Sequence, residues 1–250
     1  MTVTKAFRDA MKTGMVVAPG AYDCITARSI ERAGFSALYM TGGGTAASLK
    51  ATMAAAAKDP AVIGYLTNPF SLSADFAGPP QTAGNKPEYD ESLGSWATNF
   101  VMAPINTKNV HRTNHLLGQA YGADFVYDEM VLTGPGEQGE AMAKHVASTP
   151  MMGGADDPKP GEGPTKEERE TGHYDVLFIA EYPDGRTARF SVKGDRDPGY
   201  GSTSKMISET AIALCEHNGP GGVTTPGAAL GERLVDRLQK NAGLIFAVEN

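Results

Sequence analysis

Residues 174–193, YDVLFIAEYPDGRTARFSVK, carry the clearest strand signal in the chain. Two runs rich in Val, Ile, Phe and Thr, at Tyr174–Tyr182 and Thr187–Lys193, flank the turn residues Pro183–Gly185. β-Branched and aromatic residues favour strands, and an Asp-Gly pair favours a tight hairpin turn. This stretch therefore predicts two antiparallel strands joined as a hairpin.

The N-terminal region predicts a strand–helix–strand unit. The apolar runs MVVAPG (15–20) and Ala37–Thr41 predict strands, and Asp23–Ala33 between them predicts a helix that ends at Gly34. Strands joined through a helix run parallel, with a right-handed crossover. Other strands are expected at 100–103, 125–133 and 244–248, and helices at 46–58, 108–117, 137–147, 203–217 and 228–241. We expect the α/β (or α+β) class, with a mixed sheet, a helix layer and one antiparallel hairpin.

The composition excludes several classes of function. A net charge of −7 without a Lys/Arg-rich run argues against a nucleic-acid partner. Two cysteines cannot form a disulfide framework, which favours a reducing, cytoplasmic location. No apolar stretch approaches the roughly 20 residues of a membrane span. The expected partner is a small-molecule substrate.

The stretch SALYMTGGGTAAS (36–48) joins a predicted strand to a predicted helix through glycines. Glycines let the backbone approach a ligand, and a helix N-terminus favours an anion. Gly42, Gly44 and Ala47 also fit the G-x-G-x-x-G/A pattern of dinucleotide-binding turns. These three residues are the candidate cofactor-binding group.

A polar block follows the strand expected at 100–103. VMAPINTKNVHRTN (101–114) contains Asn106, Asn109, His111 and Arg112. Sheet proteins place ligand groups at strand ends, and amide and guanidinium donors suit an oxygen-rich ligand such as a carboxylate. The alternative is that these residues cap the next helix and hold the long irregular segment 67–95.

A second candidate is Tyr127-Asp128-Glu129, within the strand expected at 125–133. Along a strand Tyr127 and Glu129 share one face and Asp128 takes the other. A buried acid has a perturbed pKa and could transfer protons. The alternative is a solvated sheet face.

The stretch VKGDRDPGYGSTSKM (192–206) allows two interpretations. Asp195 and Asp197, two residues apart beside a glycine turn, could hold magnesium. Equally, Asp197 begins an ordinary turn, and Ser202 or Thr203 is an ordinary helix N-cap.

Several longer segments resemble one family. They are GGTAASLKATMAAAAKDP, LTNPFSL, LGSW, VMAPINTKNVHRTN, YGADFVYDEM, TGPGE, PKPGEGPTKEERE, VKGDRDPGYGSTSKM and GGVTTPGAALGERLVDRL. From about residue 43 to 250 the chain resembles the C-terminal part of saccharopine dehydrogenase-like oxidoreductases. The resemblance implies a substrate domain at 45–250, hydride transfer and NAD or NADP as cofactor. The family's Rossmann domain would then be truncated, and the chain could be inactive for that reason.

Residues 1–44 resemble another family. FRDAMKTGMVVAPGAYDCITARSIERAGFSALYMTGGG is similar to the start of the phosphoenolpyruvate mutase/isocitrate lyase superfamily of TIM barrels. By that resemblance Tyr39, Thr41, Gly42 and Gly43 would line a substrate loop, and Asp195–Gly201 spells the superfamily's DxDxGYG magnesium motif. The superfamily's reactive-cysteine loop has no counterpart in this chain. The junction near residues 41–48 then joins two lineages, as in a chimera.

Three hypotheses follow. The first is a saccharopine dehydrogenase-like oxidoreductase acting on a small acidic or acyl substrate. The second is a C–C or C–P lyase, and the third is an inert structural or dimerising module, with a homodimer as the expected assembly. For the first, the candidate catalytic residues are His111, Asp128 and Glu129, the candidate substrate-binding residues are Asn106, Asn109, Arg112 and Tyr127, and no metal ligand is proposed.

Overall fold

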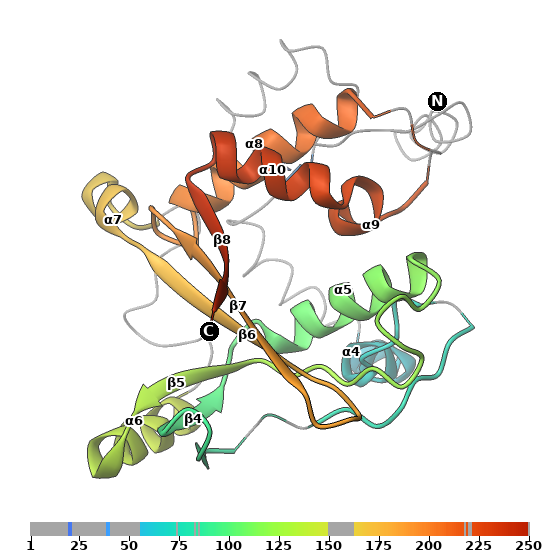
Figure 1. Cartoon of the computed structure of the whole chain (residues 1–250). Coiled ribbons are helices and arrows are strands. Elements are labelled where there is room, and N and C mark those ends of the chain that lie inside the picture. The colour runs from blue at the N-terminus through green and yellow to red at the C-terminus, as the bar shows by residue number, and fades with distance from the viewer. Residues whose placement is uncertain are drawn as a thin grey trace. The chain divides into compact units, whose positions relative to one another are not determined.

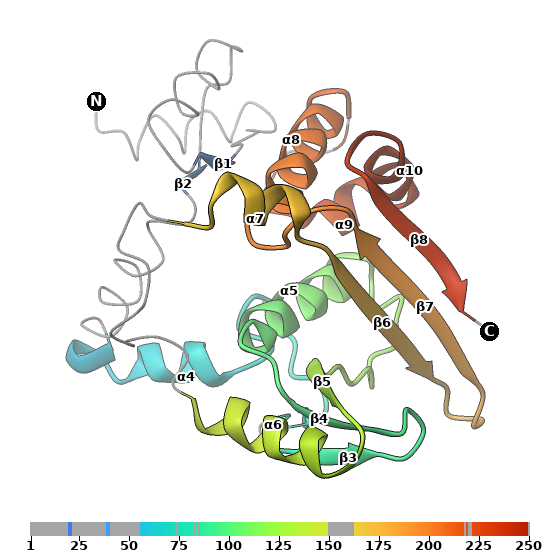
Figure 2. The ribbon, with the colours of Figure 1, turned by 90° about the vertical axis from the view of Figure 1, so that its left-hand side faces the viewer.

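The computed structural model describes residues 20–21, 39–40, 56–149 except 74, 83 and 85, and 163–249 except 218, 220 and 221. These residues form two antiparallel three-stranded sheets with helices, together with a short parallel pair (Figures 1 and 2). The expected α/β class is confirmed. The chain divides into a terminal unit, Met1–Ser48 with Pro158–Asn250, and a middle unit, Leu49–Asp157. A lineage boundary at residues 44–45 stays a prediction.

The described part of the N-terminal region is a parallel pair of short strands. β1 (Gly20–Ala21) pairs with β2 (Tyr39–Met40), with Gly20 opposite Tyr39. This pairing has the direction that the strand–helix–strand prediction requires. The helix expected at Asp23–Ala33 lies outside the described residues, as do the glycines that follow β2 in the sequence.

The sheet of the terminal unit has the order β6-β7-β8 and is antiparallel throughout (Figure 2). Its strands are β6 (Tyr174–Glu181), β7 (Thr187–Gly194) and β8 (Leu244–Glu249). The expected hairpin is confirmed. Its turn closes where the Tyr182 N–H donates to the Arg186 carbonyl at 2.9 Å, and Gly185 supplies a φ of +83°.

Two helices cover part of this sheet. α8 (Gly201–Cys215) packs beside α10 (Glu232–Asn241), and α10 also contacts β8. Their shared core contains Leu238, Ala242 and Leu244 at its centre, with Val192, Met206, Leu234 and Phe246 packed against it. Farther along the strands, a hollow of about 440 Å³ is lined mainly by Phe178, Phe190, Val192, Phe246 and Val248.

The helix expected at 228–241 is wrong as a single element. The structure has α9 (Pro226–Leu230) and then α10, separated by Gly231 with a φ of +52°. An L-residue rarely adopts that conformation, so glycine at this position breaks the helix.

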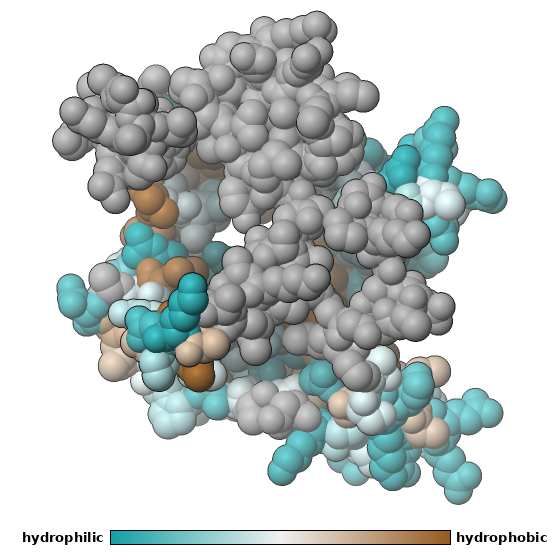
Figure 3. All heavy atoms as spheres, turned by 180° about the vertical axis from the view of Figure 1, so that it is seen from behind, coloured by the Kyte–Doolittle hydropathy of each residue, from teal (hydrophilic) through white to brown (hydrophobic). Residues whose placement is uncertain are grey.

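The segment 149–172, expected to be a loop, contains a short helix, α7 (Lys166–Thr171). A capping box begins it: the Glu168 N–H donates to Thr165 Oγ1, and the Thr165 N–H donates to Glu168 Oε2. Hydrophilic side chains gather over α7, and also over α6 (Gly136–Ser148) of the middle unit (Figure 3).

The middle unit has a second antiparallel sheet, with the order β3-β4-β5. β3 (Glu88–Asp90), β4 (Ser95–Asn99) and β5 (Met130–Gly134) form it, and α6 (Gly136–Ser148) packs against β4 and β5. Thr98 and Ala143 are fully buried. Two further helices are α4 (Ala61–Thr67) and α5 (Ala103–Leu116).

Two expected strands of this unit are displaced. The strand expected at 100–103 is wrong, because β4 ends at Asn99 and α5 begins at Ala103, with Pro104 in its first turn. Proline has the fixed φ of a helix start and lacks the N–H that a strand would pair. The strand expected at 125–133 begins only at Met130.

Candidate functional site

His111 is a buried polar side chain of the middle unit. It is 3% exposed and, with Asn114, forms the buried face of α5. Its ring centroid lies 4.4 Å from that of Phe70 and 5.7 Å from that of Phe125. Burial lowers the pKa of His111 below its ordinary value of 6.5, so the ring is neutral near pH 7. His111 is therefore a buried neutral imidazole.

Gln81, from the irregular segment before β3, connects His111 to the segment before β5. Its Nε2 donates to the carbonyls of Pro79 at 3.0 Å and Phe125 at 3.4 Å. Its Oε1 accepts the Tyr127 N–H at 2.9 Å and lies 3.0 Å from Nε2 of His111. Sequence reasoning missed Gln81, because no periodic pattern marks the segment that carries it.

Tyr127, Glu129 and Asn106 form a second hydrogen-bonded group. The Tyr127 hydroxyl donates to Glu129 Oε1 at 2.6 Å, and Asn106 Nδ2 donates to Glu129 Oε2 at 3.0 Å. All three side chains are half-buried. Burial raises the pKa of Tyr127 well above its usual range, and the bond to Glu129 and the charges of Glu129 and Asp128 raise it further. The phenol therefore keeps its proton.

The structure thus unites candidates from two separate stretches of sequence. His111 and Asn106 come from α5, Tyr127 and Glu129 come from the segment before β5, and Gln81 joins His111 to Tyr127. We call these five residues the middle-unit cluster. It offers a neutral imidazole, a protonated phenol, a carboxylate and two amides, which are groups that can hold an oxygen atom and transfer a proton.

The other candidates of this region lie apart from these bonds. Asn109 is exposed and donates to the Ile105 carbonyl of its own helix at 3.1 Å. Asp128 is exposed and accepts the N–H of Glu129 at 2.8 Å. Arg112 is half-buried on α5. The Asn109 bond stays within α5, whereas the Asp128 bond reaches only the backbone of Glu129. The expected roles of both residues stay predictions.

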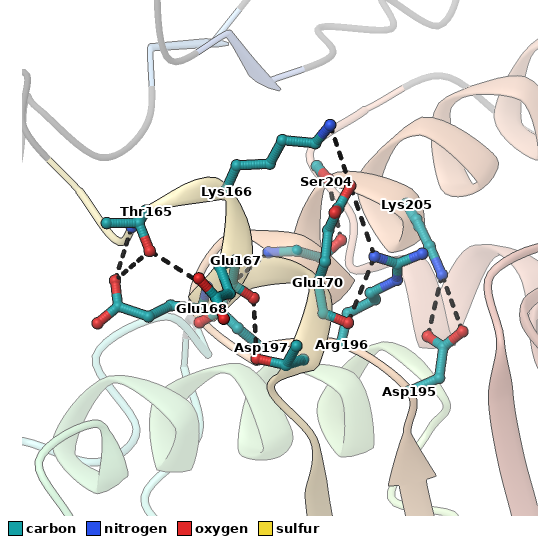
Figure 4. Close-up of polar contacts among 12 residues, drawn as sticks. Thr165, Lys166, Glu167, Glu168, Glu170, Asp195, Arg196, Asp197, Ser204 and Lys205 are labelled. Carbon is teal, nitrogen blue, oxygen red and sulfur yellow. Dashed lines mark hydrogen bonds and ion pairs between the residues drawn. The ribbon is translucent and has the colours of Figure 1, made fainter.

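The two aspartates before α8 face different partners (Figure 4). Asp195 forms an ion pair with Lys205 at 2.9 Å. Asp197 accepts the backbone N–H groups of Gly199, Tyr200 and Gly201 at 2.9, 2.9 and 2.6 Å. Within the described ranges, no group of three or more His, Cys, Asp or Glu side chains is placed to hold a metal ion.

This geometry is that of a turn and a helix cap. Burial by itself would raise the pKa of Asp197, but the three N–H donors and the charge of Arg169 outweigh it, so the pKa lies below its usual value. The expected N-cap at Ser202 or Thr203 is wrong, because α8 begins at Gly201 and both residues lie within its first turn. Ser202 is instead fully buried and lies 2.9 Å from the Tyr174 hydroxyl.

A dinucleotide cradle was expected at Gly42, Gly44 and Ala47, which lie outside the described residues. Among the described ones, Gly134–Gly139 (GPGEQG) also spells G-x-G-x-x-G between β5 and α6. However, β5 pairs only with β4, and antiparallel, whereas dinucleotide folds place this turn in a parallel sheet. This turn therefore does not fit a nicotinamide dinucleotide.

The chain is similar to several mycobacterial proteins named trans-acting enoyl reductase. It is 32% identical to one from Mycobacterium tuberculosis over 225 residues, an alignment that covers 78% of this chain and 54% of the relative. It is 30% identical to one from Mycobacterium bovis over 233 residues, covering 82% and 55%. For one from Mycobacterium ulcerans the identity is 28% over 239 residues, covering 82% and 56%. The chain spans about half the length of these curated relatives.

No protein-family model matches the chain, and no solved structure matches it. In the part of the chain that the structure describes, each helix is too short or too polar to cross a lipid bilayer.

Proposed function

We propose that this chain belongs to an oxidoreductase that reduces the carbon–carbon double bond of an unsaturated acyl substrate. The observation that carries the proposal is the similarity to trans-acting enoyl reductases, at 30–32% identity over 78–82% of the chain. The names of these relatives favour an oxidoreductase over a lyase or an inert module. The finer assignment to a saccharopine dehydrogenase-like type is part of the proposal, as are a cytoplasmic location and a homodimer.

The hydride donor that we propose is NADH or NADPH. A nicotinamide cofactor supplies a hydride to such substrates when it is bound. Because the Gly134–Gly139 turn does not fit the dinucleotide, we assign the cofactor no binding residue beyond the predicted Gly42, Gly44 and Ala47. The roles that we assign to this chain's described residues concern the acyl group.

We assign the acyl group to the middle-unit cluster. Reduction of an enoyl group adds a hydride to one alkene carbon and a proton to the other, with negative charge developing on the carbonyl oxygen between the two additions. A neutral O–H or N–H donor stabilises such an oxygen. Tyr127 is such a donor, because its raised pKa keeps the proton on its hydroxyl. Asn106 supplies a second donor, an amide N–H, within the same group.

In this proposal Glu129 orients Tyr127, and Tyr127 turns its hydroxyl from Glu129 to the substrate oxygen. His111 is hydrogen-bonded to Gln81, which also accepts the backbone N–H of Tyr127. Arg112 and Asn109 are proposed to contact the substrate, and Asp128 to assist proton transfer, from outside the cluster.

The test is an assay of the purified chain with NADH or NADPH and trans-2-enoyl thioesters of short, medium and long chain. The expected result is oxidation of the cofactor and a product that is heavier by two hydrogens in mass spectrometry. Tyr127→Phe should lower kcat at least tenfold, whereas Tyr65→Phe, at an exposed position of α4, should leave it unchanged. The proposal fails if neither cofactor is oxidised with any chain length and neither raises the melting temperature.

A further inference from the structure

We propose that Gln81 is the positioning residue of the middle-unit cluster: its amide fixes the tautomer of His111 and holds the backbone of Tyr127. The catalytic meaning of this role rests on the function proposed above. The structural part, that Gln81 determines which ring nitrogen of His111 carries the hydrogen, stands on hydrogen bonds alone.

The orientation of the Gln81 amide follows from its two carbonyl neighbours. Nε2 lies 3.0 Å from the Pro79 oxygen and 3.4 Å from the Phe125 oxygen. Carbonyl oxygens only accept hydrogen bonds, so the NH₂ group must face them. A flipped amide would bring its own oxygen against both carbonyls, and it would also lose the bond from the Tyr127 N–H. The amide therefore has one satisfactory orientation.

The tautomer of His111 follows in turn. In this orientation Oε1 faces Nε2 of His111 at 3.0 Å and also accepts the N–H of Tyr127 at 2.9 Å. Because an amide oxygen only accepts, Nε2 must carry the hydrogen. A neutral imidazole has one N–H, so Nδ1 carries the lone pair. Of the two ring nitrogens, Nδ1 is then the one that can accept a proton.

Gln81 also links the two halves of the cluster. The Gln81 oxygen that accepts Nε2–H of His111 also accepts the Tyr127 N–H. The hydroxyl of Tyr127 in turn donates to Glu129. Aromatic contacts from Phe70 and Phe125 surround the His111 ring and leave little room for it to rotate. One side chain thus sets the proton position on His111 and the backbone from which Tyr127 extends.

The test is nitrogen NMR of the histidine rings in the full chain, because ¹⁵N shifts distinguish the two neutral tautomers. The wild type should show His111 with its hydrogen on Nε2. Gln81→Met removes the acceptor while keeping a side chain of similar size, so the population of the Nε2–H tautomer relative to the Nδ1–H tautomer should fall. Gln81→Glu keeps the acceptor and adds a negative charge, which should raise the pKa of His111 by about one to three units. Gln138→Met, at an exposed position of α6, should leave the His111 signals unchanged.

Two results would overturn the inference. One is a wild-type His111 that carries its hydrogen on Nδ1, and the other is a His111 pKa that does not move in Gln81→Glu. Wild type and Gln81→Glu decide the matter even if Gln81→Met does not fold. If the NMR results hold but the enoyl assay shows no turnover, the proposed function fails while the role of Gln81 toward His111 stands. If both hold, Gln81→Met should lower kcat more than it raises KM.

Discussion

The hydroxyl of Tyr127 lies 2.6 Å from Oε1 of Glu129, and this bond joins two of the three ionisable groups of the middle-unit cluster. Burial, the bond itself and the carboxylate charge together raise the pKa of Tyr127. In Glu129→Gln the charge is gone and burial remains, so the pKa of Tyr127 should fall toward its ordinary value of 10.0. Ultraviolet difference titration against Tyr127→Phe isolates this tyrosine from the other eight in the chain. An unchanged titration would show that the carboxylate has no influence on the phenol.

The stability of the protein should depend on pH through His111. Its pKa is lowered by burial, so below about pH 6.5 the unfolded state binds a proton that the folded state does not. The free energy of unfolding should therefore decrease from that pH down to the folded-state pKa. Urea unfolding followed at a series of pH values measures this. His111→Gln should remove this part of the decrease, and His145→Gln, at an exposed position of α6, should retain it.

Asp197 should matter for stability more than Asp195. Asp197→Ala removes the acceptor of three N–H groups at the start of α8 and should cost about 1–2 kcal/mol. Asp195→Ala removes only an exposed pair with Lys205 and should cost about 0–1 kcal/mol. Chemical denaturation of both variants gives the comparison. Equal losses would mean that Asp197 does not act as a cap.

Gly139 should be the least replaceable glycine of the middle unit. A Cβ at this position would lie 1.9 Å from the Gly134 carbonyl oxygen, where α6 starts against the end of β5. Gly139→Ala should therefore destabilise the protein by about 1–3 kcal/mol, because the backbone must move. Gly64→Ala, in α4 with open space around it, should be neutral or stabilising by about 0.5–1 kcal/mol. Thermal unfolding that fails to separate the two variants would contradict this packing.

Elements with a complete local signal were predictable from the sequence. The β6–β7 hairpin follows from strand propensity and its Asp-Gly turn, and α6 was expected within one residue of its observed ends. α7 also has a local signal, the Thr165-x-x-Glu168 capping box, which could have identified it. The position of β4 depends on its pairing with β3 and β5. The residue types at 100–103 alone therefore do not predict that the strand ends at Asn99.

The candidate site was predictable by residue type but not by arrangement. Asn106, His111, Tyr127 and Glu129 come from two stretches that concentrate polar groups near strand ends. Their union depends on Gln81, which lies 46 positions from Tyr127 in a segment without periodicity. A bond of that separation depends on how a long irregular segment folds back, and no pattern within one stretch records it.

The place of β8 in the chain has a consequence for biosynthesis. β7 pairs with β8, with Gly194 opposite Leu244, although α8, α9 and α10 separate the two strands in the sequence. While a ribosome makes this chain, β7 therefore waits with one edge unpaired until residues 244–249 have emerged. The apolar side chains of Phe190 and Val192 stay without their β8 neighbours during that interval. Unpaired strand edges with apolar side chains promote association. A chaperone that covers this edge would therefore protect the nascent terminal unit from association.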